Sequence, residues 1–324
     1  MDNTQSYICN DSERLDVFLA EKLAQSRSQV AQLIKKECVY VNNKAVSRAG
    51  IKLKENQIIK IEFPELKEEK PLEIDFSVEV LYEDNELLVI NKPSGLTVHP
   101  APSVKEATLV DWLKHKGIRL STISGEERHG IVHRLDKGTS GVMVVAKNNE
   151  AHQALSEQLQ DKSMGRFYLA VIEPPLKDDI TFIEAPIKRS SNNRLKMACE
   201  AGGKDAKTAF KQLMLSDDEK YQLIACKLFT GRTHQIRVHL ETKSRHIVGD
   251  HLYGTAKKDD KSERILLHAY ELHFIHPKTN KMVSFVAPIE QKMKKFIDKK
   301  FDTEQINEVI KPQFIIDSFN NPNP

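Results

Sequence analysis

The chain has 324 residues, 40% of them hydrophobic and 29% charged, which is typical of a soluble globular protein long enough for two domains. No apolar run approaches the roughly 20 residues of a membrane span, and the first residues lack the regions of a signal peptide. The formal net charge of +3 is too small to identify a polyanionic partner. Four distant cysteines form no metal-type pair and fit reduced thiols in a cytoplasm.

The N-terminal part predicts a small module of helices and strands. Helical spacing of apolar residues predicts a helix over residues 12–25, with Ser12 as its N-cap, and a second helix that opens at residue 26 or 27. Short apolar segments predict strands over residues 39–41 and 58–63. A module of about sixty residues is near the lower size limit for independent stability.

The charge of this module is lopsided, with nine basic residues against two acidic ones between Lys22 and Lys60. A run of charge is most often only a solvated face. Here the basic residues interleave with the predicted helices and strands and do not form a tail. That arrangement suits a surface that follows the phosphates of a nucleic acid.

Several short segments of this module carry a resemblance to a known domain: Arg14–Asp16, Ser26–Ser28, Leu33–Ile34 and Val39–Asn42. Through them, residues 12–63 resemble the RNA-binding domain named after the fourth small-subunit ribosomal protein. The resemblance implies that the second helix and the turn after it hold structured RNA. The positions that it marks as RNA contacts are Arg27, Ser28, Lys35 and Lys36.

Composition divides the remaining chain into a linker, a second domain and a tail. Two prolines and mixed charge mark residues 64–75 as the linker, and the second domain follows over residues 76–300. Residues 301–324 are expected to form a tail that is frayed from Lys311 onward, where proline and asparagine are frequent. A basic excursion over residues 188–207 is open to two interpretations, a loop over a substrate groove or a plain surface loop.

The second domain is predicted to mix strands with helices. Apolar segments predict strands at residues 78–81, 87–90, 142–146, 167–172, 223–229, 266–269 and 272–274. Two helices are expected to begin at the N-caps Thr108 and Asn149, and a third is expected within residues 230–240. Alternation along the fourth of these strands puts Tyr168 on the face opposite to that of its two neighbours, where a core role is the default.

A polar cluster inside an apolar segment, residues 129–146, is the first candidate functional site. It contains His133, Arg134, Asp136 and Lys137, followed by a glycine-containing loop and a strand with a buried pattern. One interpretation is structural: Asp136 caps the loop and Arg134 is its surface partner. Most polar loops of this kind have only such a structural role. Polar groups beside a core strand are nevertheless costly unless they are paired or used, so a function is slightly favoured.

Four ordered segments carry a second resemblance: Tyr82–Asp84 with Asn91–Leu96, His133–Asp136 with Thr139–Gly141, Arg166–Ala170, and Gly231–Arg232 with His234–Arg237 and His239. Through them, residues 76–290 resemble the RluA/RluD branch of RNA pseudouridine synthases, enzymes that isomerise uridine within RNA. One departure is Gly138, where relatives often have an acidic residue. The resemblance implies an α+β protein, with a small N-terminal α/β RNA-binding domain before a catalytic domain whose mixed, largely antiparallel sheet is flanked by helices and loops.

The same resemblance implies roles for single residues. Asp136 is the essential carboxylate, which attacks the sugar or removes one of its protons, and Arg237 keeps it ionised. Tyr168 removes the proton from carbon 5 of the base or packs against the base, and Arg134 fills the gap left by the flipped uridine. Further RNA contacts are implied at Lys92, Arg232, His234 and Gln235. No step requires a metal, an organic cofactor or a nucleotide cofactor.

These observations predict a monomeric cytoplasmic enzyme that acts on RNA, and the two-domain layout favours 23S ribosomal RNA or a large-subunit precursor over transfer RNA. A non-catalytic ribosome-assembly factor is the alternative outside enzymes, because it needs only the N-terminal module and a basic cleft. A phosphorylated aspartate of the ATPase type at Asp136 lacks the expected order of threonine and glycine. A zinc site at His234 and His239 lacks both an acidic base between them and a cysteine pair.

Overall fold

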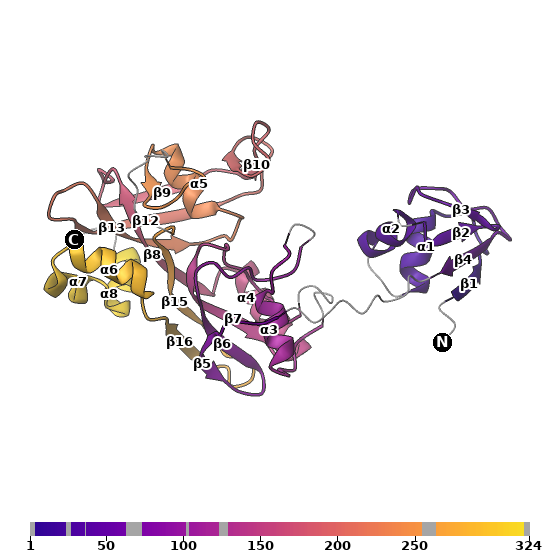
Figure 1. Cartoon of the computed structure of the whole chain (residues 1–324), viewed down its shortest axis with the longest axis horizontal. Coiled ribbons are helices and arrows are strands. Elements are labelled where there is room, and N and C mark those ends of the chain that lie inside the picture. The colour runs from indigo at the N-terminus through magenta and orange to yellow at the C-terminus, as the bar shows by residue number, and fades with distance from the viewer. Residues whose placement is uncertain are drawn as a thin grey trace. The chain divides into compact units, whose positions relative to one another are not determined.

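The computed structural model describes residues 4–23, 27–35, 37–62, 73–101, 104–122, 129–254 and 264–320. The chain divides into two compact units, Met1–Pro71 and Leu72–Pro324 (Figure 1). Most of the expected linker lies outside the described residues. No helix in the described part of the chain is long and apolar enough to cross a membrane.

The N-terminal unit is a four-stranded antiparallel sheet that shares one core with two helices (Figure 1). Across the sheet the strands are β1 (Thr4–Ile8), β4 (Ile58–Glu62), β2 (Val39–Val41) and β3 (Lys44–Ala45), and the helices are α1 (Leu15–Lys22) and α2 (Arg27–Lys35). Leu15 and Leu19 from α1, Ile34 from α2, and Ile59 and Ile61 from β4 are all fully buried. This apolar centre is what holds so small a unit together.

Two details of this unit differ from the expectation. Helix α1 begins at Leu15 and not beside Ser12, whose hydroxyl donates instead to the carbonyl of Leu53 at 3.0 Å. Its N-cap is Arg14, which makes no capping hydrogen bond with its side chain. Strand β1 was not predicted, because its polar residues carry no apolar alternation, and only its pairing with β4 defines it.

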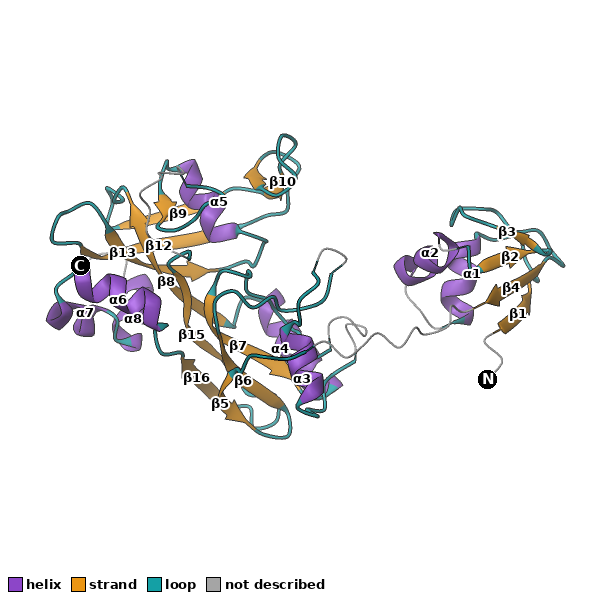
Figure 2. Ribbon diagram, viewed as in Figure 1, coloured by secondary structure: helices purple, strands orange, loops and turns teal. Residues whose placement is uncertain are grey.

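The second unit is built on a ten-stranded mixed sheet flanked by helices (Figure 2). Along the sheet the strands are β5 (Glu79–Glu83), β6 (Leu87–Lys92), β7 (Ser140–Ala146), β15 (Leu267–Ile275), β8 (Gly165–Glu173), β13 (Gln222–Leu228), β12 (Lys207–Leu215) and β9 (Ile180–Glu184), with β14 (His246–Ile247) on β8 and β16 (Met282–Val286) on β15. Among the described pairings of this sheet, only β7 with β15 is parallel. The predicted α+β class with a largely antiparallel sheet is therefore confirmed.

Side chains along the central strand β8 alternate between two cores. Tyr168 and Ala170 belong to the core that α3 and α4 cover, whereas Phe167 and Leu169 belong to the core that α6, α7 and α8 cover. The bounds of these helices are Leu109–His115 for α3, Asn149–Gln160 for α4, Gln291–Lys300 for α6, Thr303–Val309 for α7 and Pro312–Asn320 for α8. The predicted alternation is confirmed, and it turns Tyr168 toward the side of the sheet that carries the candidate site.

The helices confirm some expectations and correct others. Thr108 caps α3 in a capping box with Asp111, as predicted. The N-cap of α4 is Asn148 and not Asn149, whose side chain instead accepts a hydrogen bond from the hydroxyl of Ser121 at 2.9 Å. The expectation of a frayed tail is wrong through residue 320, because Ile306, Ile315 and Phe319 anchor α7 and α8 in the second core. The prediction gave more weight to the prolines and asparagines of this segment than to the spacing of its apolar residues.

Two further segments matter for the site. Helix α5 (Gln235–Thr242) begins later than expected and follows His234, whose backbone is left-handed with a φ of 58°. The basic excursion over residues 188–207 includes a short antiparallel hairpin, β10 (Ile187–Arg189) with β11 (Met197–Cys199). The two strands expected at residues 266–274 form the single strand β15, which has a register irregularity between Ala269 and Glu271.

Candidate active site

The loop that carries Asp136 is fixed by the strand that follows it. The amide of Thr139 donates to the carbonyl of Asp136 at 3.0 Å, which closes a tight turn. Gly141 then enters β7 with a φ of 118°, and a Cβ there would lie 2.0 Å from the carbonyl oxygen of Ala269 on β15. Only glycine allows this backbone and this close approach of the parallel pair. The position of Asp136 is therefore set by the meeting of β7 and β15.

A second segment, residues 92–96, is hydrogen-bonded to the loop of Asp136. The amide of Gly95 donates to the carbonyl of Lys137 at 2.8 Å, and the hydroxyl of Ser94 donates to the carbonyl of Gly138 at 2.7 Å. A side chain at Gly138 would meet Ile265, with Cβ 2.8 Å from its Cγ2. At this position, where the chain departs from the family pattern, the side chain of Ile265 occupies the space that a larger residue would need.

Lys92 belongs to this segment and corrects a prediction. Its ammonium donates to the carbonyls of Pro93 at 2.8 Å and Leu96 at 2.9 Å, and its side chain is fully buried. Burial lowers the pKa of Lys92 to about 7, although the charge of Asp136 opposes the shift. The predicted RNA contact at Lys92 is therefore contradicted by its position, and the residue supports the loop of Asp136 instead.

Asp136 faces a cavity with two basic groups beside its carboxylate. Nη1 of Arg237 lies 3.5 Å from Oδ2 of Asp136, and Nε2 of His234 lies 3.9 Å from the same oxygen. The side chain of Asp136 is 20% exposed, and it lines a cavity of about 560 Å³ together with Tyr168. This volume lies within the range of about 300–1,000 Å³ that is usual for ligand sites. The carboxylate thus lies beside two basic groups and is accessible to a ligand.

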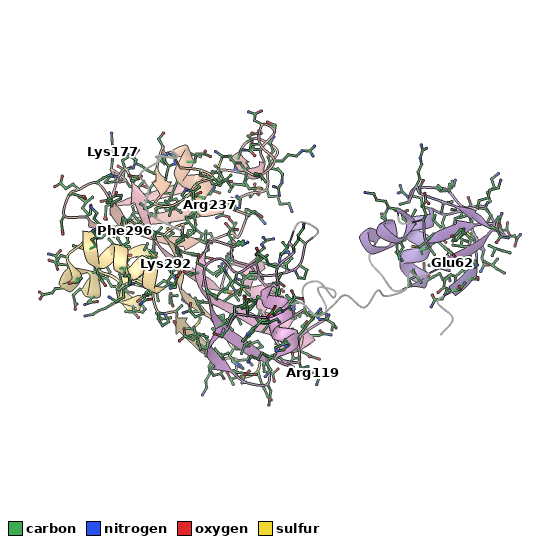
Figure 3. All side chains as sticks on the ribbon, in the orientation of Figure 1. Glu62, Arg119, Lys177, Arg237, Lys292 and Phe296 are labelled. Carbon is green, nitrogen blue, oxygen red and sulfur yellow. The ribbon has the colours of Figure 1, made fainter. Side chains whose placement is uncertain are left out.

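Arg237 is itself held by a second carboxylate that sequence reasoning missed. Its Nε and Nη2 donate to the two carboxylate oxygens of Asp250, at 2.7 Å and 2.8 Å, and its guanidinium lies over the ring of Tyr253 at 4.8 Å. Burial disfavours the charged form of Arg237, but the hydrogen bonds and charge of Asp250 outweigh it, so the pKa of Arg237 is raised. Arg237 (labelled in Figure 3) therefore stays cationic and is aimed at Asp136 by Asp250.

The start of α5 brings His234 to the cavity and buries its neighbour. Nδ1 of His234 is 2.9 Å from the hydroxyl of Tyr253, and burial lowers the pKa of the imidazole while the charge of Asp136 opposes this. The Gln235 side chain is buried; it accepts from Thr230 and donates to the carbonyl of Lys207 at 3.0 Å. The predicted RNA contact at Gln235 is contradicted by this burial, because the amide organises the loop before the helix.

The zinc alternative also fails in the described residues. His239 is fully buried, with Nδ1 2.9 Å from the hydroxyl of Thr208 and Nε2 3.2 Å from the carbonyl of Ala185. His234 makes different contacts at the cavity. No group of three possible metal ligands comes together anywhere in the described parts of the chain. His239 is therefore a structural residue of the α5 packing.

Tyr168 presents its phenol to the cavity from β8. Burial raises the pKa of Tyr168 to about 12; the charge of Arg166 opposes this shift, and the charge of Asp136 adds to it. At neutral pH the phenol is consequently protonated. No hydrogen bond within the described residues holds its hydroxyl, and Tyr168 lines the cavity, where a ligand can reach it.

The remaining predicted RNA contacts divide between the two units. Arg134 is exposed at the cavity, and Arg232 lines it while its Nε donates to the carbonyl of Asp205 at 2.9 Å. In the N-terminal unit, Arg27 is 59% exposed and paired with an aspartate, and Lys35 is exposed. The side chain of Ser28 and the whole of Lys36 lie outside the described residues.

Comparisons with known proteins agree with both parts of this architecture. Residues 86–242 match the family model described as RNA pseudouridylate synthase, and residues 13–59 match the S4 domain. Two human proteins have the same fold: RNA Pseudouridylate Synthase Domain Containing 1, with a TM-score of 0.57, 22% identity and coverage of 72% of this chain and 94% of that one, and Domain Containing 4, with a TM-score of 0.54, 22% identity and coverage of 68% and 92%. The fold and the matched models define an isomerase that acts on RNA.

Relatives of higher identity narrow the family. An uncharacterized RNA pseudouridine synthase of Helicobacter pylori (strain J99) is 46% identical over 95% of this chain and 96% of its own length. YlyB of Bacillus subtilis, described in the same words, is 41% identical over 89% and 94%. Ribosomal large subunit pseudouridine synthase D of Zymomonas mobilis is 38% identical over 86% and 91%. The chain belongs to the RNA pseudouridine synthase family, in the RluA/RluD branch with an N-terminal S4 domain.

Proposed function

We propose that this enzyme isomerises specific uridines to pseudouridine in large-subunit (23S) ribosomal RNA or its precursor, with Asp136 as the essential carboxylate. The observation that carries the proposal is the accessible carboxylate at the cavity, beside the guanidinium of Arg237 and in the same cavity as the phenol of Tyr168. A protein that only bound RNA would gain nothing from a carboxylate directed at a polyanion.

The reaction needs a charged group at the sugar. The bond between nitrogen 1 of uracil and C1′ of the ribose breaks, the base rotates, and carbon 5 bonds to C1′. Asp136 can attack C1′ to form an ester, or remove a proton from C2′ to give a glycal-like intermediate. Both routes use a carboxylate oxygen of Asp136, and the guanidinium of Arg237 lies 3.5 Å from Oδ2.

Tyr168 is suited to the last step, in which carbon 5 loses its proton to restore the aromatic ring. In the free protein its phenol is protonated, because burial and the charge of Asp136 both raise its pKa. In both routes Asp136 is a free carboxylate again once carbon 5 has bonded to C1′, so its charge does not help Tyr168 at this step. Nitrogen 1 takes up one proton as carbon 5 loses one, so the phenol can pass its own proton on toward nitrogen 1 and accept the proton of carbon 5. We assign the removal of the carbon 5 proton to Tyr168 because its phenol lines the same cavity as Asp136.

Access of the base to this cavity requires the target uridine to leave its stack. The carboxylate lies inside a cavity, so a uridine within a folded RNA must be flipped out to reach it. Arg134 is exposed next to Asp136, and a planar guanidinium can stack where a base has left. We therefore assign the filling of that gap to Arg134.

Two observations favour ribosomal RNA as the substrate. The S4 domain of the N-terminal unit supplies a second basic RNA contact, and the Zymomonas mobilis relative bears a large-subunit ribosomal name. A large folded RNA can engage both units of the chain. We further propose that the enzyme works as a cytoplasmic monomer, since the carboxylate, the guanidinium and the phenol all come from one chain.

The test is a map of pseudouridines in total RNA from a strain that lacks this gene, complemented by the natural enzyme or by Asp136→Ala. We expect one or more 23S pseudouridines to disappear, to return with the natural enzyme, and to stay absent with Asp136→Ala although that variant still binds RNA. A loss confined to transfer RNA would move the substrate. Restoration by Asp136→Ala would remove the carboxylate from the mechanism and favour an assembly factor.

A further inference from the structure

Arg166 is a buried cation for which the proposed mechanism gives no use. It lies on β8 two residues before Tyr168, on the same face of the strand, and lines the same cavity. Its side chain is deeply buried, with the residue only 7% exposed. In the described residues it forms no ion pair, and its Nε has no hydrogen-bond partner. Since a buried guanidinium without a partner is costly, its retention calls for a ligand.

The groups around Arg166 add positive charge and offer no anion of their own. Arg232 lies close enough for the two guanidiniums to repel each other. His133 accepts a hydrogen bond from the amide of Val144 at 3.2 Å, and burial first, with the charge of Arg166 second, lowers its pKa to about 3, so it is neutral. Asp136 is the carboxylate of the cavity lining, and in the described residues its basic neighbours within 4 Å are Arg237 and His234, not Arg166.

We propose that Arg166, together with Arg232, binds a backbone phosphate next to the flipped nucleotide and so positions its sugar over Asp136. The proposal rests on the proposed function, because it takes an RNA nucleotide as the occupant of the cavity. A phosphate matches the unpaired guanidinium in charge and in its bidentate geometry. The carbonyl groups of uracil are neutral acceptors, and they do not balance the charges of the buried Arg166 and its half-buried neighbour Arg232.

Gly231 offers a way to move this guanidinium without removing its charge. A Cβ at Gly231 would lie 2.6 Å from Nη1 of Arg166, which is the far end of a flexible side chain. Gly231→Ala therefore displaces the guanidinium and leaves the strand and its neighbours in place. The close contact also explains why the loop before α5 has a glycine at this position.

The experiment compares the binding of uridine, uridine 5′-phosphate and uridine 3′-phosphate to the full chain by calorimetry. One of the two phosphates should bind about tenfold more tightly than uridine, as expected for one charge-assisted contact. Arg166→Met should abolish that preference, Gly231→Ala should reduce it, and Arg166→Lys should restore part of it. Arg119→Met makes the same change at an exposed arginine far from Arg237 in Figure 3, and it should keep the full preference.

Three outcomes would overturn the phosphate site. The first is that the natural enzyme binds neither phosphate more tightly than uridine. The second is that Arg166→Met weakens the binding of all three ligands by the same factor, which a structural role predicts. The third is that Gly231→Ala, which carries the test if Arg166→Met does not fold, leaves the preference for phosphate unchanged. Failure of the proposed function is recognised separately: it removes the pseudouridine change in ribosomal RNA and leaves the phosphate preference intact.

Discussion

The tripeptide Arg-Leu-Asp occurs once in each unit, and the two copies have opposite surroundings. In the N-terminal unit, Asp16 accepts hydrogen bonds from Arg14 at 2.9 Å and from Arg27 at 2.6 Å, and its side chain is 6% exposed. The hydrogen bond from Arg14 is the largest cause that lowers the pKa of Asp16 to about 2. Here the arginine of the tripeptide is hydrogen-bonded to the aspartate of the same tripeptide, and both carboxylate oxygens accept hydrogen bonds from arginines.

In the catalytic unit the arginine of the tripeptide, Arg134, is not the ion-pair partner of Asp136 in the described residues. Arg134 is exposed, and among the described residues the basic partners of Asp136 are Arg237 and His234, both about a hundred residues further along the chain. Even Arg237 gives its short hydrogen bonds to Asp250 and reaches Asp136 only at 3.5 Å. Asp16 is therefore closed off by its partners, whereas Asp136, the proposed catalytic carboxylate, keeps its oxygens open beside a cation that is bound to Asp250.

The largest expected effect comes from the same substitution at the two aspartates. Asp136→Asn should lower the rate of tritium release from uridine labelled at carbon 5 in ribosomal RNA by about 10⁴-fold or more, because the amide is neither nucleophile nor base. Asp16→Asn should leave the rate of that step, measured at saturating enzyme, within about twofold. Comparable losses in both variants would show that the two surroundings do not separate structure from chemistry.

The next effect is expected at the carboxylate that aims Arg237. Asp250→Asn keeps the size of the side chain and removes the bidentate ion pair, so the guanidinium is free to turn onto Asp136 and block it. We expect the single-turnover rate to fall by about 100-fold with little change in RNA affinity. Asp298→Asn alters an exposed pair with Lys294 and serves as the control. A fall in RNA affinity alone would instead assign Asp250 to binding.

This comparison also shows what the sequence can and cannot predict. Local periodicity was sufficient for β7, for the alternation along β8 and for the cap at Thr108, because each depends on residues close in the chain. Asp250 and Tyr253 were missed, because no spacing connects them with Asp136 and only the fold brings them to Arg237. The two copies of Arg-Leu-Asp are indistinguishable as tripeptides, so only the segments that flank them separated Asp136 from Asp16 in the sequence.

Burial of polar residues was the second limit. Lys92 and Gln235 have the residue types of RNA contacts and lie in segments that resemble the family, yet both point into the protein and bond backbone carbonyls. In the sequence, a lysine or glutamine that supports a loop is the same residue type as one that binds a phosphate. The distinction depends on which carbonyl groups the fold leaves without partners, and that is a property of tertiary structure.

A smaller effect is expected when the pH is lowered toward the pKa of Asp16. The folded-state pKa of Asp16 is about 2, below the usual value of about 3.9. Its contribution to stability is therefore complete above pH ~4 and is lost as the pH falls toward ~2. Hydrogen exchange of the amides in α1 and β4 should accelerate over this interval in the full chain. Asp16→Asn should show that faster exchange already at pH 7 and no further change from this group on acidification.

The smallest effect is expected at Tyr253, which contacts Arg237 and His234, the basic neighbours of Asp136. Its hydroxyl accepts from the amide of Met197 on β11 at 2.7 Å and contacts His234 at 2.9 Å, while its ring lies under Arg237. Tyr253→Phe keeps the ring and removes the contacts of the hydroxyl with Met197 and His234, so Arg237 should stay in place and the hairpin should loosen. We expect faster hydrogen exchange at Met197 with a loss of single-turnover rate of about fivefold or less. A loss as large as that of Asp250→Asn would mean that the hydroxyl, through His234, acts on Asp136 as directly as the ion pair does.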